Sequence, residues 1–526
     1  KLIVQRKYLF KQLNYLTTME KLHKHFEENW KYYLGAILIF AFAIRLFIYL
    51  KYQGQAIWWD EADYLSIAKS WALGTPHAAP AYRAWGIAVI YSPLFWLGFG
   101  EATMKFLEVI FSTAGVYLTF LVGKEFFNKK VGLIAALGMS TYWVHLFWTP
   151  RISLGIVGLL FFCGAALSFY KGYVKKQGTK YLILAGALIG PGIIFYEAVG
   201  FILPFLFLFL LVTERLKFLT NKKFWIFILA ILISALPFLI ANQVMHDSFY
   251  PRIDNMLTRT ESTVSGESGL DWSNPISTLF GATTIYFITM PSIIMWGFTI
   301  LLLIGLIYFI DLILGFDLVL KNKSEKLKKD FYILLWPIVF LIIVGWLVST
   351  GVGFYFEPRF AFPSIPILFA IAANGGLWFY NKFKDQLKWL AALAVVVLII
   401  WSMVTAFNFG IDTLEAKKDS FYHERAAGEW LRDNTREDEV VLACSQNVPL
   451  IFYSEKFIDG FSNDNTTKFE AALEEHQPDY LVFDFYGPFC NSQYITDYQN
   501  HLTLLQAYFL DEGQTMPVIL IYKYDN

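Results

Sequence analysis

Residues 389–411 read WLAALAVVVLIIWSMVTAFNFGI and carry no charged side chain between Lys388 and Asp412. An apolar run of about 17–25 residues is long enough to cross the hydrocarbon core of a bilayer as one helix. The whole chain of 526 residues is 56% hydrophobic and only 16% charged, with a mean hydropathy of +0.46. Because a soluble protein carries roughly 25% charged residues, a soluble enzyme of this length is excluded. The sequence predicts a polytopic α-helical membrane protein.

Ten further charge-poor runs precede this one, and we interpret the total of about eleven as membrane-spanning helices. The runs are centred on residues 33–50, 102–122, 131–149, 152–170, 181–197, 198–213, 224–242, 284–312, 331–350, 359–378 and 388–410. A shorter run at 85–100 contains Pro93, so we interpret it as a re-entrant or interfacial segment of the first outer loop, 51–101. The outer loop 243–283 is long enough to act as a lid over a site.

Lysine and arginine are distributed unequally between the two sets of loops. If the N-terminus is cytoplasmic, the inner segments hold 26 basic residues and the outer loops hold 8. An excess of basic residues marks the cytoplasmic side, so we expect a multi-pass protein of the cell membrane with residues 1–32 in the cytoplasm. No cleavage site follows the first helix, which is therefore expected to remain in the protein. Residues 1–18 precede Met19, a plausible natural start, and are interpreted as an upstream extension.

The composition changes at residue 412. Residues 33–411 are interpreted as the transmembrane domain, and an odd number of spans places residues 412–526 outside the cell. Residues 1–411 have a net charge of +13 and residues 412–526 one of −13, so the zero net charge is a cancellation. Helix patterns at 419–434 and 467–476 and strand patterns at 439–443, 480–484 and 518–522 predict a small extracytoplasmic α/β domain. Cys444 and Cys490 both lie in it and could pair.

Three acidic residues occur within four positions of the first outer loop. Asp60 can cap a helix that runs to about Leu73, with Gly74 as its stop. On such a helix Asp60 and Asp63 share one side with Tyr64, while Glu61 points about 100° away. One interpretation is a cap with first-turn acids that favour the helix dipole. The other is a general base at the membrane surface, or a pair of metal ligands.

Several other charged residues are predicted at the outer face. Each arginine either reaches toward lipid headgroups or belongs to a group that binds an anion through charge-assisted hydrogen bonds. Glu197 either pairs with an arginine or lines the site. Within the first span, Arg45 is expected to pair inside the bundle, because a lone cation in lipid is costly. The three outer arginines of interest are Arg83, Arg151 and Arg359.

The order of these motifs resembles the GT-C superfamily of integral-membrane glycosyltransferases. The similarity is strongest to the branch with dolichyl-phosphate-mannose–protein mannosyltransferases, aminoarabinose transferases and Rgt-like enzymes, and it covers nearly the whole chain. The motifs that carry it are Arg45; the Asp60, Glu61, Tyr64, Ala68 and Gly74 helix; Tyr82, Arg83 and Gly86; Phe99 and Gly100; 125–128; 195–198; Glu357-Pro-Arg-Phe360 with Pro363 and Pro366; and 425–434. The chain departs from the pattern at Phe360, where Tyr is usual, and after Arg151, where no acid follows.

The resemblance implies transfer of a sugar from a polyprenyl-phosphate donor to an acceptor hydroxyl on the outer face, with inversion. Asp60 is the implied base and Glu61 assists it. The implied substrate-binding residues are Asp63, Tyr64, Tyr82, Arg83, Arg151, Glu197, Glu357 and Arg359. A divalent metal stays open, with Asp60 and Glu61 as its ligands if one binds.

The sugar is a hexose or a pentose, and the acceptor is a glycan, a lipid or a protein; no nucleic acid is expected. A transporter or lipid flippase is the alternative. It predicts charged or broken helices at mid-membrane and two pseudo-symmetric halves.

Overall fold

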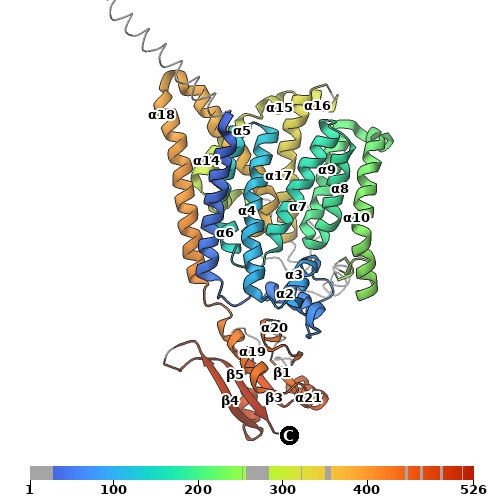
Figure 1. Cartoon of the computed structure of the whole chain (residues 1–526), viewed down its shortest axis with the longest axis vertical. Coiled ribbons are helices and arrows are strands. Elements are labelled where there is room, and N and C mark those ends of the chain that lie inside the picture. The colour runs from blue at the N-terminus through green and yellow to red at the C-terminus, as the bar shows by residue number, and fades with distance from the viewer. Residues whose placement is uncertain are drawn as a thin grey trace, which may run out of the picture.

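A computed structural model describes residues 28–251, 253–255, 284–321, 323–349, 357–444, 448–461, 466–485, 490–511 and 513–525. The chain forms a bundle of long helices with a small mixed α/β domain beyond one end of it (Figure 1). Most of the segment interpreted as cytoplasmic and most of the interpreted lid lie outside the described residues.

Among the described residues, eight helical segments are long and apolar enough to cross a membrane. They are Glu28–Tyr52, Glu101–Phe126 (α4), Leu154–Val174 (α7, Leu154–Phe169, continued by a π-helical turn), Glu197–Thr220 (containing α9, Ile202–Glu214), Lys222–His246 (α10), Trp296–Leu314 (α14, Trp296–Ile307, and α15, Ile310–Leu314), Glu325–Leu347 (within α17, Glu325–Ser349) and Pro358–Ala416 (containing α18, Ile365–Ala416). α16 covers Phe316–Leu320.

Three of the predicted spans, at 131–149, 181–197 and 284–312, differ from single long helices. The run at 181–197 is α8, Thr179–Phe195, which is shorter than the other spans. The run at 284–312 is interrupted at Met295, whose φ of 66° separates α13, Met290–Ile294, from α14. The predicted runs at 359–378 and 388–410 are two helices that meet at a kink at Leu387, where φ is −132°, and together they carry the label α18.

The run at 131–149 is divided into α5, Lys129–Ser140, and α6, Trp143–Trp148. A helix that ends inside the bundle leaves carbonyl groups without partners. Arg45 is such a partner, because its guanidinium donates to the Ser140 carbonyl at 2.9 Å and to the Met139 carbonyl at 3.3 Å. It also contacts the Ser112 hydroxyl and the His145 ring. The expectation that Arg45 pairs inside the bundle is confirmed, with carbonyls and not an acid as its main partners.

Two short helices lie at the end of the bundle nearest the α/β domain (Figure 1): α2, Trp59–Leu73, and α3, Gly86–Trp96. α3 contains Pro93 and is too short to span, in agreement with the interfacial interpretation of 85–100. A Cβ atom on Gly86 would lie 2.8 Å from the backbone of Phe195. Glycine therefore allows the start of α3 to approach the end of α8.

The C-terminal domain contains a five-stranded sheet in the order β2-β1-β3-β5-β4. The parallel strands β1, β2 and β3 occupy one side, and β5 runs antiparallel to both β3 and β4. Its elements are α19 (Tyr422–Asn434), β1 (Val441–Ala443), α20 (Val448–Ser454), β2 (Ile458–Gly460), α21 (Thr466–His476), β3 (Tyr480–Asp484), α22 (Gln493–Asp497), β4 (Leu502–Phe509) and β5 (Pro517–Tyr524). Cys444 and Cys490 form a disulfide, with Cα atoms 5.4 Å apart. The sequence predicted α19, α21, β1, β3 and β5 and missed the others.

Candidate functional site

The site is built on the first turn of α2. The helix begins at Trp59, after Trp58 in an extended conformation, and no side chain caps it. The prediction that Asp60 caps the helix is wrong: its carboxylate is held by two arginines instead of by backbone N–H groups. The predicted stop at Gly74 is confirmed, since this residue has a φ of 75° and its N–H donates to the Ser70 carbonyl.

Arg83 bridges the two acids that share one side of α2. Its Nη1 lies 3.2 Å from Asp60 Oδ1, and its Nε lies 2.6 Å from Asp63 Oδ2. Asp63 is almost completely buried, whereas the side chain of Asp60 is 30% exposed. The predicted spacing on the helix therefore brings Asp60 and Asp63 to one guanidinium, with Asp60 as the more accessible carboxylate.

Arg359 is distant from Asp60 in the sequence but contacts it directly. Its Nη2 donates to Asp60 Oδ2 at 2.9 Å, and its Nε pairs with Glu357. The guanidinium carbon lies 4.4 Å from the ring centroid of Trp148, at the end of α6. Asp60 thus has one oxygen on each of two arginines that come from distant parts of the chain.

The surroundings shift the pKa values of Asp60 and Asp63 in opposite directions. Burial opposes the ionisation of Asp60, but Arg359 and Arg83 together outweigh it and hold the pKa of Asp60 below its ordinary value. For Asp63, burial dominates and raises the pKa to about 6, although Arg83 offsets part of the effect. Burial and the charge of Asp60 raise the pKa of Tyr64, so this phenol stays protonated beside the carboxylates. Asp60 is therefore the group that is fully ionised at neutral pH.

Glu61 faces a different set of residues, as the helical spacing predicts. Its carboxylate is buried, and burial raises its pKa to about 7 despite the nearby charges of Arg151 and Lys105. Arg151 is also buried; its guanidinium lies over the rings of Trp58 and Phe147, and it donates to the Phe147 carbonyl. The structure therefore brings Arg83 and Arg359 together at Asp60 and places Arg151 with Glu61.

Tyr82 and Glu197 line a small open pocket beside Arg83. Trp85 closes one wall, and its indole N–H donates to Asn242 Oδ1 at 2.6 Å. The sequence interpretation did not include Asn242 or Trp148, although Trp148 stands in an aromatic stretch just before Arg151.

The acids do not form a metal site. Asp60 and Asp63 share Arg83, and Glu61 faces other cations. Within the described parts of the chain, no three His, Cys, Asp or Glu side chains converge as metal ligands. A divalent cation needs several free oxygen ligands, so this donor set does not fit one.

A second, larger cleft of about 1010 Å³ lies between the loop after α2 and the C-terminal domain. Gly74 and Pro76 line one side, and the other carries both acidic and basic side chains, among them Glu437, Asp438 and Lys456. At 1.5 Å per helical residue, the end of α2 is roughly 20 Å from Asp60. The cleft is therefore separate from the arginine-lined site.

Residues 79–240 match the model of the dolichyl-phosphate-mannose-protein mannosyltransferase family. The match includes Arg83, Arg151 and Glu197 and leaves Asp60 and Arg359 outside. No curated protein sequence matches the chain at a significant level.

Solved structures share the fold at low sequence identity. ArnT from Cupriavidus metallidurans bound to undecaprenyl phosphate has a TM-score of 0.58 and 13% identity, covering 93% of this chain and 97% of that one. The oligosaccharyltransferase AglB from Archaeoglobus fulgidus, in complex with an inhibitory peptide and a dolichol-phosphate, has a TM-score of 0.57 and 12% identity, covering 95% and 74%. The chain is thus similar to this mannosyltransferase family over residues 79–240, and it shares the fold of ArnT and AglB.

Proposed function

We propose that the protein transfers a hexose or pentose from a polyprenyl-phosphate donor to a hydroxyl of an acceptor glycan, lipid or protein, with inversion. One observation carries the proposal: Asp60 lies between Arg83 and Arg359 at the end of the helical bundle nearest the C-terminal domain. Two guanidinium groups at one point suit a phosphate. The lipid phosphates in the ArnT and AglB structures support a donor of this class.

The donor phosphate and Asp60 compete for the same two guanidinium groups. While Arg83 and Arg359 are bound to Asp60, its low pKa makes it a weak base. A phosphate that takes over their N–H groups removes the cations that lower this pKa. Asp60 then becomes a stronger base only when donor is present, which suppresses proton abstraction in the empty site.

The reaction is a single displacement. The acceptor oxygen forms a bond to the anomeric carbon while the bond from that carbon to the phosphate oxygen breaks. The acceptor proton passes to Asp60, and the bonding electrons leave with the polyprenyl phosphate. Arg83 and Arg359 stabilise the negative charge that develops on this leaving group. A single displacement needs no covalent enzyme intermediate.

The remaining candidates act around this centre. Asp63 and Glu357 hold Arg83 and Arg359 in place through their ion pairs. Glu61 pairs electrostatically with Arg151 and fixes the first turn of α2. Beside the donor phosphate, the protonated Tyr64 phenol is a further hydrogen-bond donor.

The pocket next to Arg83 is the proposed place for the sugar. Tyr82 and Glu197 line it and supply hydrogen-bonding groups for sugar hydroxyls.

The site and the C-terminal domain are proposed to face the outside. The excess of basic residues in the opposite loops supports this orientation. The disulfide between Cys444 and Cys490 supports it too, since structural disulfides form in oxidising compartments.

The test is transfer by the purified protein in lipid nanodiscs, supplied with polyprenyl-phosphate hexoses and pentoses and with acceptor glycans, lipids and peptides, and followed by mass spectrometry. Asp60→Asn is expected to lose at least a hundredfold in rate, as for loss of a general base. Asp412→Asn, at an exposed position of α18, is the control. Full activity of Asp60→Asn overturns the role of the base.

A further inference from the structure

The segment that leads into α2 is held by the C-terminal domain. It covers residues 53–57 and joins the first spanning helix to Trp58. On the bundle side, buried Lys105 donates from Nζ to the Gln53 carbonyl at 3.1 Å and to the Gln55 carbonyl at 2.6 Å. The backbone ahead of the site is thereby fixed to α4.

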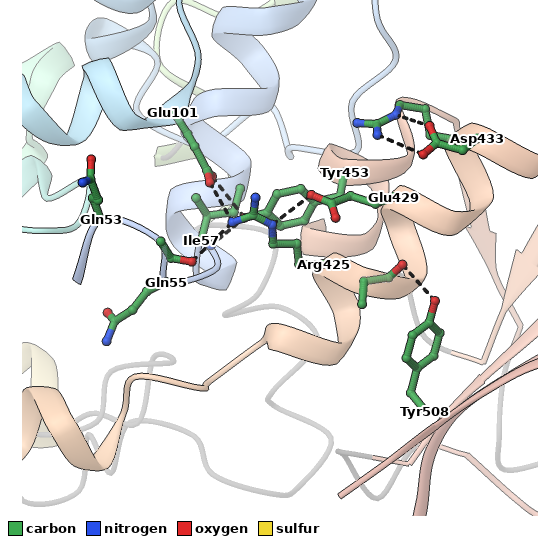
Figure 2. A network of polar contacts seen from close by, with 12 residues as sticks. Gln53, Gln55, Ile57, Glu101, Arg425, Glu429, Asp433, Tyr453 and Tyr508 are labelled. Carbon is green, nitrogen blue, oxygen red and sulfur yellow. Dashed lines mark hydrogen bonds and ion pairs between the residues drawn. The ribbon is translucent and has the colours of Figure 1, made fainter. Parts of the chain in front are cut away.

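The contacts on the other side come from α19 and α20. Figure 2 shows Arg425 and Tyr453 meeting Glu101 at the start of α4. Arg425 Nη1 lies 3.1 Å from Glu101 Oε1 and donates to the Gly54 carbonyl at 3.3 Å. The Tyr453 hydroxyl donates to Glu101 Oε2 at 3.1 Å and accepts from the Ile57 N–H at 2.9 Å. Tyr453 thus connects the bundle to the backbone just before α2.

The C-terminal domain also holds the C-terminal half of α2. Glu455, directly after α20, lies 2.7 Å from Lys69 through its Oε1. Phe452 and Tyr453 belong to the same buried cluster as Ile57 and Leu65. Polar contacts near both ends of the helix, with apolar packing between them, fix both its position and its rotation.

We infer that Tyr453 is a positioning residue for the proposed catalytic helix and that the C-terminal domain sets the place of Asp60. The inference rests on the proposed function. Arg359 belongs to the bundle. Asp60 lies only three residues after Ile57, and the Ile57 N–H donates a hydrogen bond to the Tyr453 hydroxyl. Movement of the start of α2 would therefore separate Asp60 from Arg359. A misplacement of about 1 Å at reacting groups can cost a hundredfold in rate.

The experiment compares Tyr453→Phe with Tyr508→Phe in the full-length protein in nanodiscs. Each change removes one hydroxyl. The Tyr508 hydroxyl, also drawn in Figure 2, donates to the Ala426 carbonyl inside the C-terminal domain, so this variant controls for loss of domain stability. Both variants are measured for kcat, for donor KM and for hydrogen exchange over residues 53–63.

The expected result for Tyr453→Phe is a fall in kcat of about tenfold or more, with a smaller change in donor KM and faster exchange at Ile57. Tyr508→Phe is expected to match the wild type in all three. Equal kcat or equal exchange in the two variants overturns the inference.

If Tyr453→Phe does not fold, the Lys69–Glu455 pair provides the same test. Lys69→Glu and Glu455→Lys are each expected to lower kcat, and the double exchange is expected to restore it. Absence of rescue also contradicts the inference. A wild-type protein without transfer on any donor contradicts the proposed function instead, while the exchange measurement still tests the contact.

Discussion

Arg359 and Asp60 are 299 positions apart in the sequence, and their side chains form a 2.9 Å hydrogen bond. Arg359 lies just before α18, and Asp60 lies in the first outer loop. The pair joins the first outer loop to the segment before α18, and the proposed donor phosphate has to separate the two side chains.

Asp60→Asn should separate donor binding from turnover. The amide removes the negative charge that competes with phosphate for Arg83 and Arg359, so affinity for polyprenyl phosphate should rise severalfold while transfer is lost. Binding is measured by titration of the purified variant in nanodiscs with the unglycosylated lipid phosphate. Weaker binding than in the wild type would contradict the competition and assign Asp60 to donor binding.

Arg359→Ala should weaken binding of the polyprenyl-phosphate donor. Loss of a charge-assisted hydrogen bond costs about 1.5–3 kcal/mol, which corresponds to a rise of roughly tenfold to a hundredfold in apparent donor KM. Arg359→Lys should recover only part of this, because an ammonium cannot reproduce the planar fork that lies over Trp148. An unchanged donor affinity in Arg359→Ala would remove Arg359 from the phosphate site.

The pH dependence of stability should become shallower in Glu61→Gln. Burial raises the folded-state pKa of Glu61 from 4.5 to about 7, so the folded state binds more protons than the unfolded state between these values. Its contribution to stability is therefore complete below about pH 4.5 and is lost as the pH rises to about 7. The measurement is the difference between the unfolding temperatures at pH 5 and pH 8, with exposed Glu437→Gln as control. An equal difference in both variants and the wild type would refute the buried, proton-binding state of Glu61.

Thiol labelling should reveal the predicted side of the C-terminal domain. Cys444 and Cys490 form a disulfide, and the remaining cysteine, Cys163, is buried. In intact cells, a membrane-impermeant maleimide should label the protein only after treatment with an impermeant reductant. Cys444→Ala together with Cys490→Ala should abolish the signal. Labelling of the wild type that appears only after the membrane is opened would place the domain inside.

Much of this site could be predicted locally. The spacing of Asp60 and Asp63 on a helix predicts a shared face, and the structure places Arg83 between them. The role of Arg151 was less predictable: three outer arginines look equivalent in sequence, and only the packing of Trp58 and Phe147 sets Arg151 apart with Glu61. The sequence does not indicate a positioning role for Tyr453, because a tyrosine in an apolar helix is typical of a core.

The helices, too, could be predicted only in part from the sequence. Runs of apolar residues predict length and composition well, but the division into α5 and α6 depends on the Arg45 side chain, which satisfies the carbonyls that the break exposes. The short strands β1 and β2 are stabilised by neighbours distant in the chain, so β2 has little pattern of its own.

The position of β5 in the sheet has a consequence for biosynthesis. β5 lies between β3 and β4 and consists of Pro517–Tyr524, near the last described residue of the chain. The sheet cannot close until these residues have left the ribosome, and α20 rests on that sheet while it holds α2. A nascent chain with all its membrane helices inserted would still lack a fixed Asp60 until Pro517–Tyr524 have been synthesised and have joined the sheet.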